Sequence, residues 1–286
     1  MGPQICRDGD RVLRLTKHHG LGNDFLVALA DQNPELTIDP QLARSLCDRH
    51  RGIGADGLIL SFPPSEEGND ACMVLLNADG SEAEISGNGI RCLGQALLRH
   101  EGRSEGDLRI ETAGGVRQLR TVRGSADQEI WIQVDMGAAA AGPELGSLSQ
   151  DYPALHRGTF NIGNPHLVLV LESEDQLQQL DLASAGQRLE SEYPEGINVE
   201  FVYVDSTDHM QLRVWERGAG ITEACGSGAT VAAAAAHSMG LVGEQVSVSM
   251  PGGEAQVAIA DSTLLLTGPS AFIAEVTVLF PEVTVS

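Results

Sequence analysis

The sequence predicts a mixed α/β fold built from two similar halves, and three observations support this prediction. Short apolar segments typical of strands alternate with glycine-rich turns along most of the 286 residues. Two glycine turns lead directly into helix-forming runs, at residues 87–89 and 226–228. The turns of the first half also recur, in the same order, in the second half.

The first half reads as strands interrupted by two helices. Residues 1–11 are polar and read as a loose lead-in, and a short helix is expected at residues 42–47. Ile90, Leu93 and Leu97 have the spacing of the buried face of a second helix, which begins after the glycines at 87–89. Strands are expected at residues 12–15, 58–62, 73–76, 108–111, 117–122 and 130–134.

The second half repeats this alternation after a glycine-, alanine- and proline-containing crossover at residues 136–150. A helix is expected over residues 177–189, and Gly268-Pro269 is interpreted as a boundary. These signals predict two domains. The first consists of residues 1–135 together with residues 269–286, and the second of residues 136–268. Strands are expected on both sides of the turn within residues 158–170, at 196–202 and 211–215, and as short segments after Val246, Ala255 and Thr263.

The repeat itself has a nearly constant offset. Gly22-Asn23 matches Gly163-Asn164 at 141 residues, and Gly57 falls against Asn198 at the same offset. Asn77 aligns with Glu216 at an offset of 139 residues, and Ser86-Gly-Asn-Gly aligns with Cys225-Gly-Ser-Gly at the same offset. Single matches of glycine turns carry little weight, but matches in register indicate a duplicated domain. Two facing halves would bring residues 86 and 225 to opposite sides of one cleft.

Cys225 is expected at the start of a buried helix, because Gly226-Ser-Gly228 precedes an alanine-rich run. Free N–H groups and the positive end of the helix dipole would there favour the thiolate over the thiol. The same N–H groups would hold a carboxylate. A buried structural thiol is the alternative for Cys225, as a plain helix N-cap is for Ser86.

Composition narrows the function classes. A net charge of −22 argues against nucleic acids and anionic membrane surfaces as partners, and no apolar run approaches membrane-spanning length. Lys17 is the only lysine that could form a Schiff base, and it stands on an expected strand, so no cofactor is expected. The five cysteines form no metal-binding pattern, so no metal is expected, and free thiols indicate the cytoplasm.

Ten short motifs, most of them built around glycine turns, are spread over nearly the full length of the chain. They are His19-Gly-Leu-Gly-Asn-Asp-Phe25, Asp48-Arg-His-Arg-Gly-Ile-Gly-Ala-Asp56, Asn77-Ala-Asp-Gly-Ser81, Gly87-Asn-Gly89, Gly163-Asn-Pro-His166, Gly196-Ile-Asn-Val-Glu-Phe201, Glu216-Arg-Gly-Ala-Gly220, Ala224-Cys-Gly-Ser-Gly228, Pro251-Gly-Gly253 and Thr267-Gly-Pro269. Each glycine turn alone would be a weak signal, but together the motifs are specific. Through them the chain resembles the diaminopimelate epimerase family over nearly its full length.

The resemblance implies a fold and a reaction. The fold would be two pseudo-symmetric α/β domains, each a β-barrel-like sheet around a central helix, with the active site between them. The reaction would interconvert LL- and meso-2,6-diaminopimelate without metal or pyridoxal phosphate, in lysine and peptidoglycan precursor biosynthesis. The resemblance also implies a homodimer.

The sequence departs from the family at one catalytic position. Family members use two cysteines, one per domain, as thiolate base and thiol acid; Cys225 matches one, and Ser86 stands where the other is expected. A hydroxyl is a far weaker acid than a thiol, so Ser86 would need a strongly basic carbanion or a stabilised alkoxide. Cys92 lies about 9 Å further along the helix and does not replace it.

The remaining site residues follow from the resemblance. Cys225 and Ser86 would be catalytic, Glu216 would pair with the α-ammonium group, and His166 with Glu216 would tune the nearby thiol or hydroxyl. The distal end of the substrate would be held by Asn77, Asn164, Asn198 and Arg217, with Asn23 lining the pocket. The reacting carboxylate would be bound by the backbone at Gly87, Asn88, Gly226 and Ser227.

Other functions remain open from sequence alone. A related racemase or a dehydratase would tolerate Ser86 more easily, and a homologue that binds diaminopimelate with low activity is a further alternative. A cysteine hydrolase with Cys225 as nucleophile and His166 as base is a different class, but no third orienting residue is evident.

Overall fold

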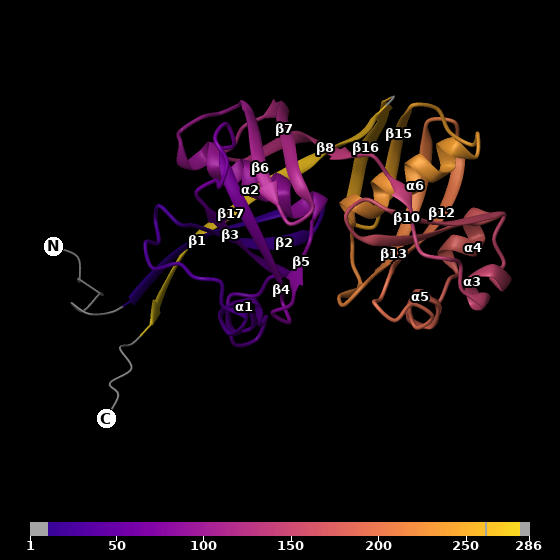
Figure 1. The fold of residues 1–286 in the computed structure, drawn as a ribbon, viewed down its shortest axis with the longest axis horizontal. Coiled ribbons are helices and arrows are strands. Elements are labelled where there is room, and N and C mark those ends of the chain that lie inside the picture. The colour runs from indigo at the N-terminus through magenta and orange to yellow at the C-terminus, as the bar shows by residue number, and fades with distance from the viewer. Residues whose placement is uncertain (1–10, 261, 281–286) are drawn as a thin grey trace.

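The computed structural model describes residues 11–260 and 262–280, and these form a mixed α/β structure with two lobes (Figure 1). The expected lead-in before Arg11 and Cys6 lie outside the described residues. The first lobe contains β1 (Arg11–Gly20), β2 (Asn23–Leu29), α1 (Pro40–Cys47), β3 (Gly57–Phe62), β4 (Ala71–Asn77), β5 (Glu82–Ala83), α2 (Gly87–His100), β6 (Asp107–Thr112), β7 (Gly115–Gly124) and β8 (Glu129–Gly137).

The second lobe repeats this order after a short connection through β9 (Ala140–Ala141). It contains α3 (Ser147–Asp151), β10 (His156–Asn161), β11 (Pro165–Val170), α4 (Glu174–Gln178), α5 (Leu182–Glu190), β12 (Asn198–Ser206), β13 (His209–Glu216), β14 (Gly220–Ile221), α6 (Gly226–Ser238), β15 (Gln245–Met250) and β16 (Gly253–Ala260). The last described element is β17 (Thr263–Phe280).

Strand pairing confirms that the repeat seen in the sequence is a structural one. The parallel pair β2–β3 places Phe25 opposite Gly57, and the parallel pair β11–β12 places His166 opposite Asn198, which are the positions 141 residues later. The antiparallel pairs β3–β4 and β12–β13 correspond in the same way, as do the parallel pairs β4–β6 and β13–β15. Each lobe therefore curls its strands in the same order around one helix, α2 or α6.

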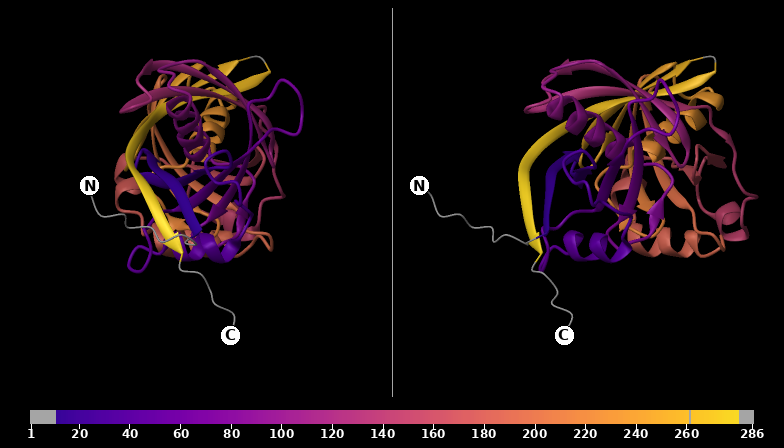
Figure 2. Two further views of the ribbon diagram at one scale, coloured as in Figure 1. Left: turned by 90° about the vertical axis from the view of Figure 1, so that its left-hand side faces the viewer. Right: turned by 60° about the vertical axis from the view of Figure 1, so that its left-hand side comes forward.

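Strand β17 joins the two lobes (Figure 2). It pairs with β16 through residues 263–267, with β8 through residues 264–271, and with β1 through residues 271–280. One continuous strand thus belongs first to the second lobe and then to the first. Two expectations were wrong here. The strand after Thr263 is not short, and it does not end at Gly268-Pro269. Pro269 is tolerated inside β17 because it lies between the residues that pair with β16 and those that pair with β1, where no N–H donor is needed.

The helix expected at residues 177–189 is also wrong as a single element. The chain forms α4 and α5 instead, separated by residues 179–181. Asp181 ends the connection, because its side chain accepts a hydrogen bond from the backbone N–H of Ser184 and so caps α5.

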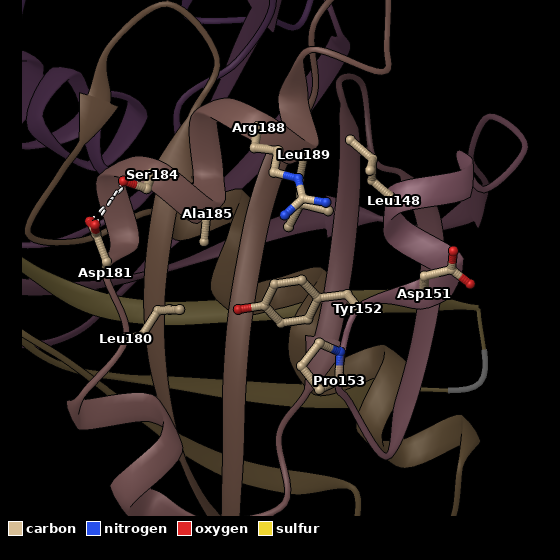
Figure 3. Close-up of a pocket in the computed structure, with 10 residues that line it drawn as sticks. All are labelled: Leu148, Asp151, Tyr152, Pro153, Leu180, Asp181, Ser184, Ala185, Arg188 and Leu189. Carbon is tan, nitrogen blue, oxygen red and sulfur yellow. Dashed lines mark hydrogen bonds between the residues drawn. The ribbon is translucent and has the colours of Figure 1, made fainter.

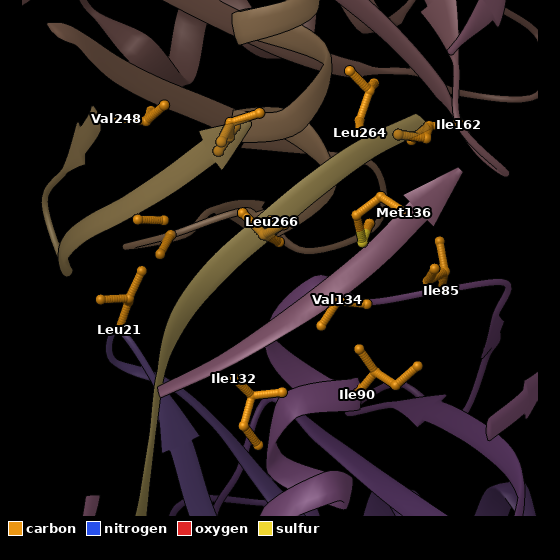
Figure 4. Close-up of a cluster of buried hydrophobic side chains, with 14 of the residues drawn as sticks. Leu21, Ile85, Ile90, Ile132, Val134, Met136, Ile162, Val248, Leu264 and Leu266 are labelled. Carbon is orange, nitrogen blue, oxygen red and sulfur yellow. The ribbon is translucent and has the colours of Figure 1, made fainter. Parts of the chain in front are cut away.

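The main hydrophobic core extends from one lobe into the other (Figure 4). It includes Ile90 from α2, Leu266 from β17 and Val248 from β15 in one cluster. Helix α6 packs tightly because its buried face is made of small residues, with Ala232, Ala233 and Ala235 all fully buried. The starts of α2 and α6 are therefore held in fixed positions by a shared core.

Within the described residues, no helix is both long enough and apolar enough to span a membrane.

Candidate active site

The two central helices begin against each other. A Cβ atom added to Gly87 would lie 3.0 Å from the Cα of Gly226, and one added to Gly226 would lie 2.9 Å from the Cα of Gly87. Ser86 is the N-cap of α2 and Cys225 is the N-cap of α6. Because each glycine follows an N-cap directly, the hydroxyl-bearing and thiol-bearing residues occupy equivalent positions on the two sides of this contact.

Both N-cap side chains accept a hydrogen bond from their own helix. Ser86 Oγ accepts from the N–H of Gly89 at 3.0 Å, and Cys225 Sγ accepts from the N–H of Gly228 at 3.3 Å. The capping role of Ser86 that the sequence suggested is therefore present. It does not prevent proton transfer, because a capping hydroxyl keeps its own hydrogen free to donate.

A cleft of about 910 Å³ opens between the lobes beside these helix starts. It is lined from both halves of the chain. The expected site residues on its walls are Asn23, Asn77, Ser86, Asn164, Asn198, Glu216 and Arg217. The other expected residues are buried: His166, Asn88, Cys225, Gly87, Gly226 and Ser227.

The structure reverses one expectation about Cys225. Burial, together with the charges of Glu216 and Glu200, raises its pKa well above the usual value, although hydrogen bonds from Ser227 and Gly228 act in the opposite direction. The helix N-terminus is thus outweighed by desolvation and by two carboxylates. In the unliganded protein Cys225 is a thiol at neutral pH.

Glu216 is placed next to this thiol. It accepts hydrogen bonds from Thr222 and Cys225, and burial raises its pKa above the usual value, with the charge of Glu200 as a further cause. A positively charged group entering the cleft beside Glu216 would favour its ionised form.

The hydrogen-bond partners of His166 are Glu200 and Asn164. Its Nδ1 lies 2.7 Å from Oε1 of Glu200, and its Nε2 lies 2.9 Å from Oδ1 of Asn164. His166 influences Glu216 only through its charge. Among the described residues no hydrogen bond joins His166 to Cys225, so the base–nucleophile contact that a cysteine hydrolase needs is missing.

Glu200 is the residue that the sequence reading missed. It is fully buried on β12, and within the described part of the chain its Oε2 has no hydrogen-bond partner. A Cβ atom added to Gly228 would lie 2.8 Å from its Oε1, so its carboxylate lies against the first turn of α6. The available signal was a glutamate inside the otherwise apolar run Val199-Glu-Phe-Val202.

The two halves of the site differ in charge despite their common fold. Ile59 occupies the position of Glu200: a Cβ atom added to Gly89 would lie 3.3 Å from Ile59 Cδ1 and 3.3 Å from Ser86 Oγ. By the same correspondence Phe25 takes the place of His166, and Asn77 the place of Glu216. At these three positions the Cys225 side carries two carboxylates, and the Ser86 side carries no charge.

Arg217 and Asn198 lie side by side on the wall of the cleft. Asn198 Oδ1 accepts from the backbone N–H of Arg217 at 2.8 Å, which fixes the start of this turn. The Arg217 guanidinium reaches across the cleft to Glu84 of the first lobe, with Nη2 2.7 Å from Oε2. Both side chains are partly exposed, so a carboxylate from solution can replace Glu84 as the partner of Arg217.

The remaining asparagines are held by local contacts. Asn23 Nδ2 donates to Asp56 Oδ2 at 2.8 Å, and Asn77 Nδ2 donates to Ser81 Oγ at 3.0 Å. The Asn23 and Asn77 amides thus take fixed orientations toward the cleft.

Lys17 is held by two contacts within the first lobe. Lys17 lies 2.9 Å from Asp24 Oδ2 and donates to the carbonyl of Gly54 at 2.6 Å, so its amine is already committed. No group of three His, Cys, Asp or Glu side chains within residues 11–260 and 262–280 is arranged to bind a metal.

A second cavity, of about 340 Å³, lies between α3 and α5 in the second lobe (Figure 3). Tyr152, Leu180 and Arg188 line this cavity. At its edge the hydroxyl of Ser184 donates a hydrogen bond to Asp181 Oδ2. It contains none of the expected site residues, so the interlobe cleft is the candidate active site.

The architecture is shared with solved structures of low sequence identity. A hydroxyproline epimerase from Agrobacterium vitis superposes with a TM-score of 0.71 at 17% identity, covering 94% of this chain and 91% of that chain. A phenazine biosynthesis protein from Bacillus anthracis superposes with a TM-score of 0.72 at 16% identity, covering 94% of this chain and 99% of that chain. The fold therefore places the chain in a class of two-lobed proteins with a cleft between duplicated halves.

Sequence comparison then defines the family within this class. The diaminopimelate epimerase family model matches residues 15–141 and 158–273. The diaminopimelate epimerase of Halothermothrix orenii is 36% identical, over 90% of this chain and 95% of its own length. That of Azotobacter vinelandii is 38% identical, over 92% of this chain and 98% of its own length. The chain belongs to the diaminopimelate epimerase family.

Proposed function

We propose that this protein interconverts LL- and meso-2,6-diaminopimelate by moving a proton at one α-carbon without a cofactor. The observation that carries the proposal is the contact of the two helix starts, which presents Ser86 and Cys225 from opposite lobes beside one cleft. Family membership supports the choice of substrate. As the family relationship implies, the product would enter lysine and peptidoglycan precursor biosynthesis.

The proposed binding mode uses both ends of the cleft. Arg217, Asn77, Asn164 and Asn198 hold the distal amino-acid end, and Asn23 lines the pocket near the reacting carbon. The reacting carboxylate accepts hydrogen bonds from the backbone N–H groups that open the two helices, at Gly87, Asn88, Gly226 and Ser227. A helix has four such N–H groups without an intrahelical partner, and they stabilise the negative charge that develops when the α-proton leaves.

Proton transfer then depends on Glu216. The α-ammonium group of the substrate pairs with Glu216 and offsets one of the two carboxylates that raise the pKa of Cys225. Binding of substrate thus lowers the pKa of Cys225, and the thiol releases its proton to solvent. The resulting thiolate removes the α-proton, and Ser86 donates its hydroxyl proton to the opposite face and is reprotonated from solvent. In the reverse direction Cys225 is the acid and Ser86 the base, which is the unfavourable step.

The test is incubation of the protein with LL-diaminopimelate in deuterated water. We expect the meso isomer to form slowly and to carry deuterium on one α-carbon. Mass spectrometry detects the deuterium, and chiral chromatography separates the isomers. A ketone or imine product would identify a dehydratase instead. Tight binding with no exchange at the α-carbon would identify a non-catalytic homologue and contradict the proposal.

We further propose a homodimer located in the cytoplasm, as the family relationship suggests. Sedimentation velocity of the purified chain at micromolar concentration tests the dimer, and a purely monomeric species would contradict it.

A further inference from the structure

Arg91, in the second turn of α2, is a buried cation without a counter-ion. Its side chain is fully buried, and in the described part of the chain Nη1 has no hydrogen-bond partner. No carboxylate in the described part of the chain forms an ion pair with Arg91. Burial lowers the pKa of Arg91 to about 10, so it keeps its charge at neutral pH. An uncompensated buried charge is costly, which calls for a functional explanation.

Glycines on two strands make room for this guanidinium. A Cβ atom added to Gly268 of β17 would lie 3.0 Å from Arg91 Cζ, and one added to Gly20 of β1 would lie 3.3 Å from Nη2. The carbonyl of Pro269 accepts from Nε at 3.3 Å. The charged group is therefore housed in a fitted space rather than trapped by chance.

Arg91 acts on the active-site end of the helix through Asn88. Its Nη2 donates to Asn88 Oδ1 at 2.6 Å. Since arginine can only donate, the amide oxygen of Asn88 faces Arg91 and the amide nitrogen faces the other lobe. Nδ2 donates to the carbonyl of Ala224 in the other lobe at 2.9 Å, and to Asn23 Oδ1 in its own lobe at 3.2 Å. Ala224 directly precedes Cys225, so this network connects both helix starts.

The equivalent position in the second lobe has no charge. Thr230 replaces Arg91 there, and its Oγ1 donates to the carbonyl of Gly226 at 2.8 Å. The start of α6 instead faces Glu216 and Glu200, whose charges both raise the pKa of Cys225. The two helix starts have similar backbones but neighbours of opposite charge: the buried cation Arg91 lies behind α2, and the carboxylates of Glu216 and Glu200 lie beside α6.

We propose that Arg91 is a positioning residue that makes the α2 N-terminus the preferred seat of the reacting α-carboxylate, and that it acts through Asn88. The ammonium group on the same carbon is then directed toward Glu216 on the other lobe. This inference rests on the proposed function, because it assumes an amino-acid substrate in the cleft. It explains why a buried charge is retained where the duplicated half has a neutral threonine.

The experiment compares Arg91→Met and Arg91→Lys, measured by calorimetric titration with diaminopimelate between pH 6.5 and pH 9. Methionine keeps the volume and removes the charge, and we expect its Kd to rise about tenfold or more, the size of a lost charge-assisted contact. Lysine keeps a charge that burial makes titratable, so its Kd should approach the wild-type value at pH 6.5 and worsen toward pH 9 relative to wild type.

In the unliganded protein the following neighbouring groups have pKa values outside this range. A change in Cys225 that substrate binding causes is common to wild type and variants, so it cancels in the comparison. On α2 itself, burial raises the pKa of Cys92 to about 11; on β1, burial lowers that of His18 to about 4. On β2, hydrogen bonds from Arg49 and Lys17 lower the pKa of Asp24, outweighing burial. On α6 the pKa of Cys225 is raised well above its usual value, and the contacting segment of β17, Gly268-Pro-Ser270, has no titratable side chain.

Thr230→Val is the matched control, because it changes the equivalent buried position of α6 without altering charge. Its Kd should stay within about twofold of wild type, and thermal melts show whether each variant is folded. A folded Arg91→Met protein with wild-type affinity, or Arg91→Lys affinity that does not change with pH relative to wild type, would overturn the inference alone. Absence of diaminopimelate binding by the wild-type protein would overturn the proposed function and this inference with it.

Discussion

Gly87 and Gly226 touch where the two central helices begin, with room for no side chain between them. A Cβ atom on Gly87 would lie 2.7 Å from Leu266 Cδ2 and 3.0 Å from the Cα of Gly226. Backbone cannot move aside as a flexible side chain can. The spacing of Ser86 and Cys225 thus depends on two residues that carry no chemistry.

The first prediction concerns this contact. Gly87→Ala should separate the helix starts, lower kcat/KM for diaminopimelate about tenfold or more, and reduce the free energy of unfolding by about 1–3 kcal/mol, the range for overpacked cores. Steady-state kinetics and urea titration measure both effects. Gly243→Ala is the control, since its Cβ would be 3.6 Å from the nearest atom, the carbonyl oxygen of Thr207. Equal kinetics for Gly87→Ala and wild type would show that the contact does not set the site geometry.

The second prediction concerns the serine at the catalytic position. Ser86→Cys should raise kcat for epimerisation about 100-fold, because a thiol is the stronger acid and its thiolate the more accessible base. Ser86→Ala should abolish epimerisation and cost about 1 kcal/mol of stability through loss of the N-cap. A coupled assay that measures the rate of epimerisation of diaminopimelate is run on wild type, Ser86→Cys and Ser86→Ala. A cysteine variant no faster than wild type, with the fold intact, would mean that position 86 does not transfer a proton.

The third prediction concerns the thiol of Cys225. Because burial, Glu216 and Glu200 raise its pKa, alkylation of the unliganded protein by iodoacetamide should be slow at pH 7 and accelerate as the pH rises. Glu216→Gln removes one carboxylate charge, so it should lower the pKa of Cys225 and speed alkylation at pH 8. Peptide mass spectrometry counts each cysteine separately, with Glu254→Gln as a surface control. Unchanged or slower labelling in Glu216→Gln would contradict the assigned cause.

The fourth prediction links His18 to acid stability. Its Nδ1 lies 2.9 Å from Gln95 Oε1, and burial lowers its pKa from 6.5 to about 4. The unfolded chain therefore binds a proton at a higher pH than the folded one, so the contribution of His18 is complete above pH 6.5 and is lost as the pH falls toward 4. The loss amounts to roughly 3 kcal/mol. Urea titrations at pH 7 and pH 4.5 should show a smaller decrease for His18→Gln than for wild type; an equal decrease would assign the acid sensitivity elsewhere.

The fifth prediction concerns distal recognition. Arg217→Gln should raise KM for diaminopimelate about tenfold or more, because a carboxylate loses a bidentate charged partner. Its kcat should change less than its KM, since Arg217 does not contact the reacting carbon. Arg188→Gln, at the second cavity, is the control and should match wild type. A fall in kcat with KM unaltered would remove Arg217 from the distal site.

The sequence predicted the backbone of this protein better than its electrostatics. The offset of 139–141 residues correctly matched Phe25–Gly57 with His166–Asn198, because glycine turns and apolar strands are encoded locally. It also placed Ser86 and Cys225 at helix starts.

What failed depended on residues distant in the chain. The raised pKa of Cys225 arises from burial and from the charges of Glu216 and Glu200. No local motif encodes that burial or the proximity of Glu200, which lies on another strand. The break between α4 and α5 was missed because apolar periodicity continued across the Asp181 cap. No strand ends at Gly268-Pro269, because β17 exchanges partners there and tolerates both residues. The domain limits at residues 135 and 268 stay a prediction.

The exchange of partners along β17 also bears on how the duplicated protein can be divided. A chain cut after residue 135 would leave β1 without the strand that covers it through residues 271–280. A fragment beginning at residue 136 would in turn carry residues 265–280 of β17 without their partners β8 and β1. Unpaired strand edges favour aggregation. Truncation alone therefore yields neither lobe as an intact unit. To produce an independent lobe, one would have to add a strand that takes the place of β17 or of its missing partners.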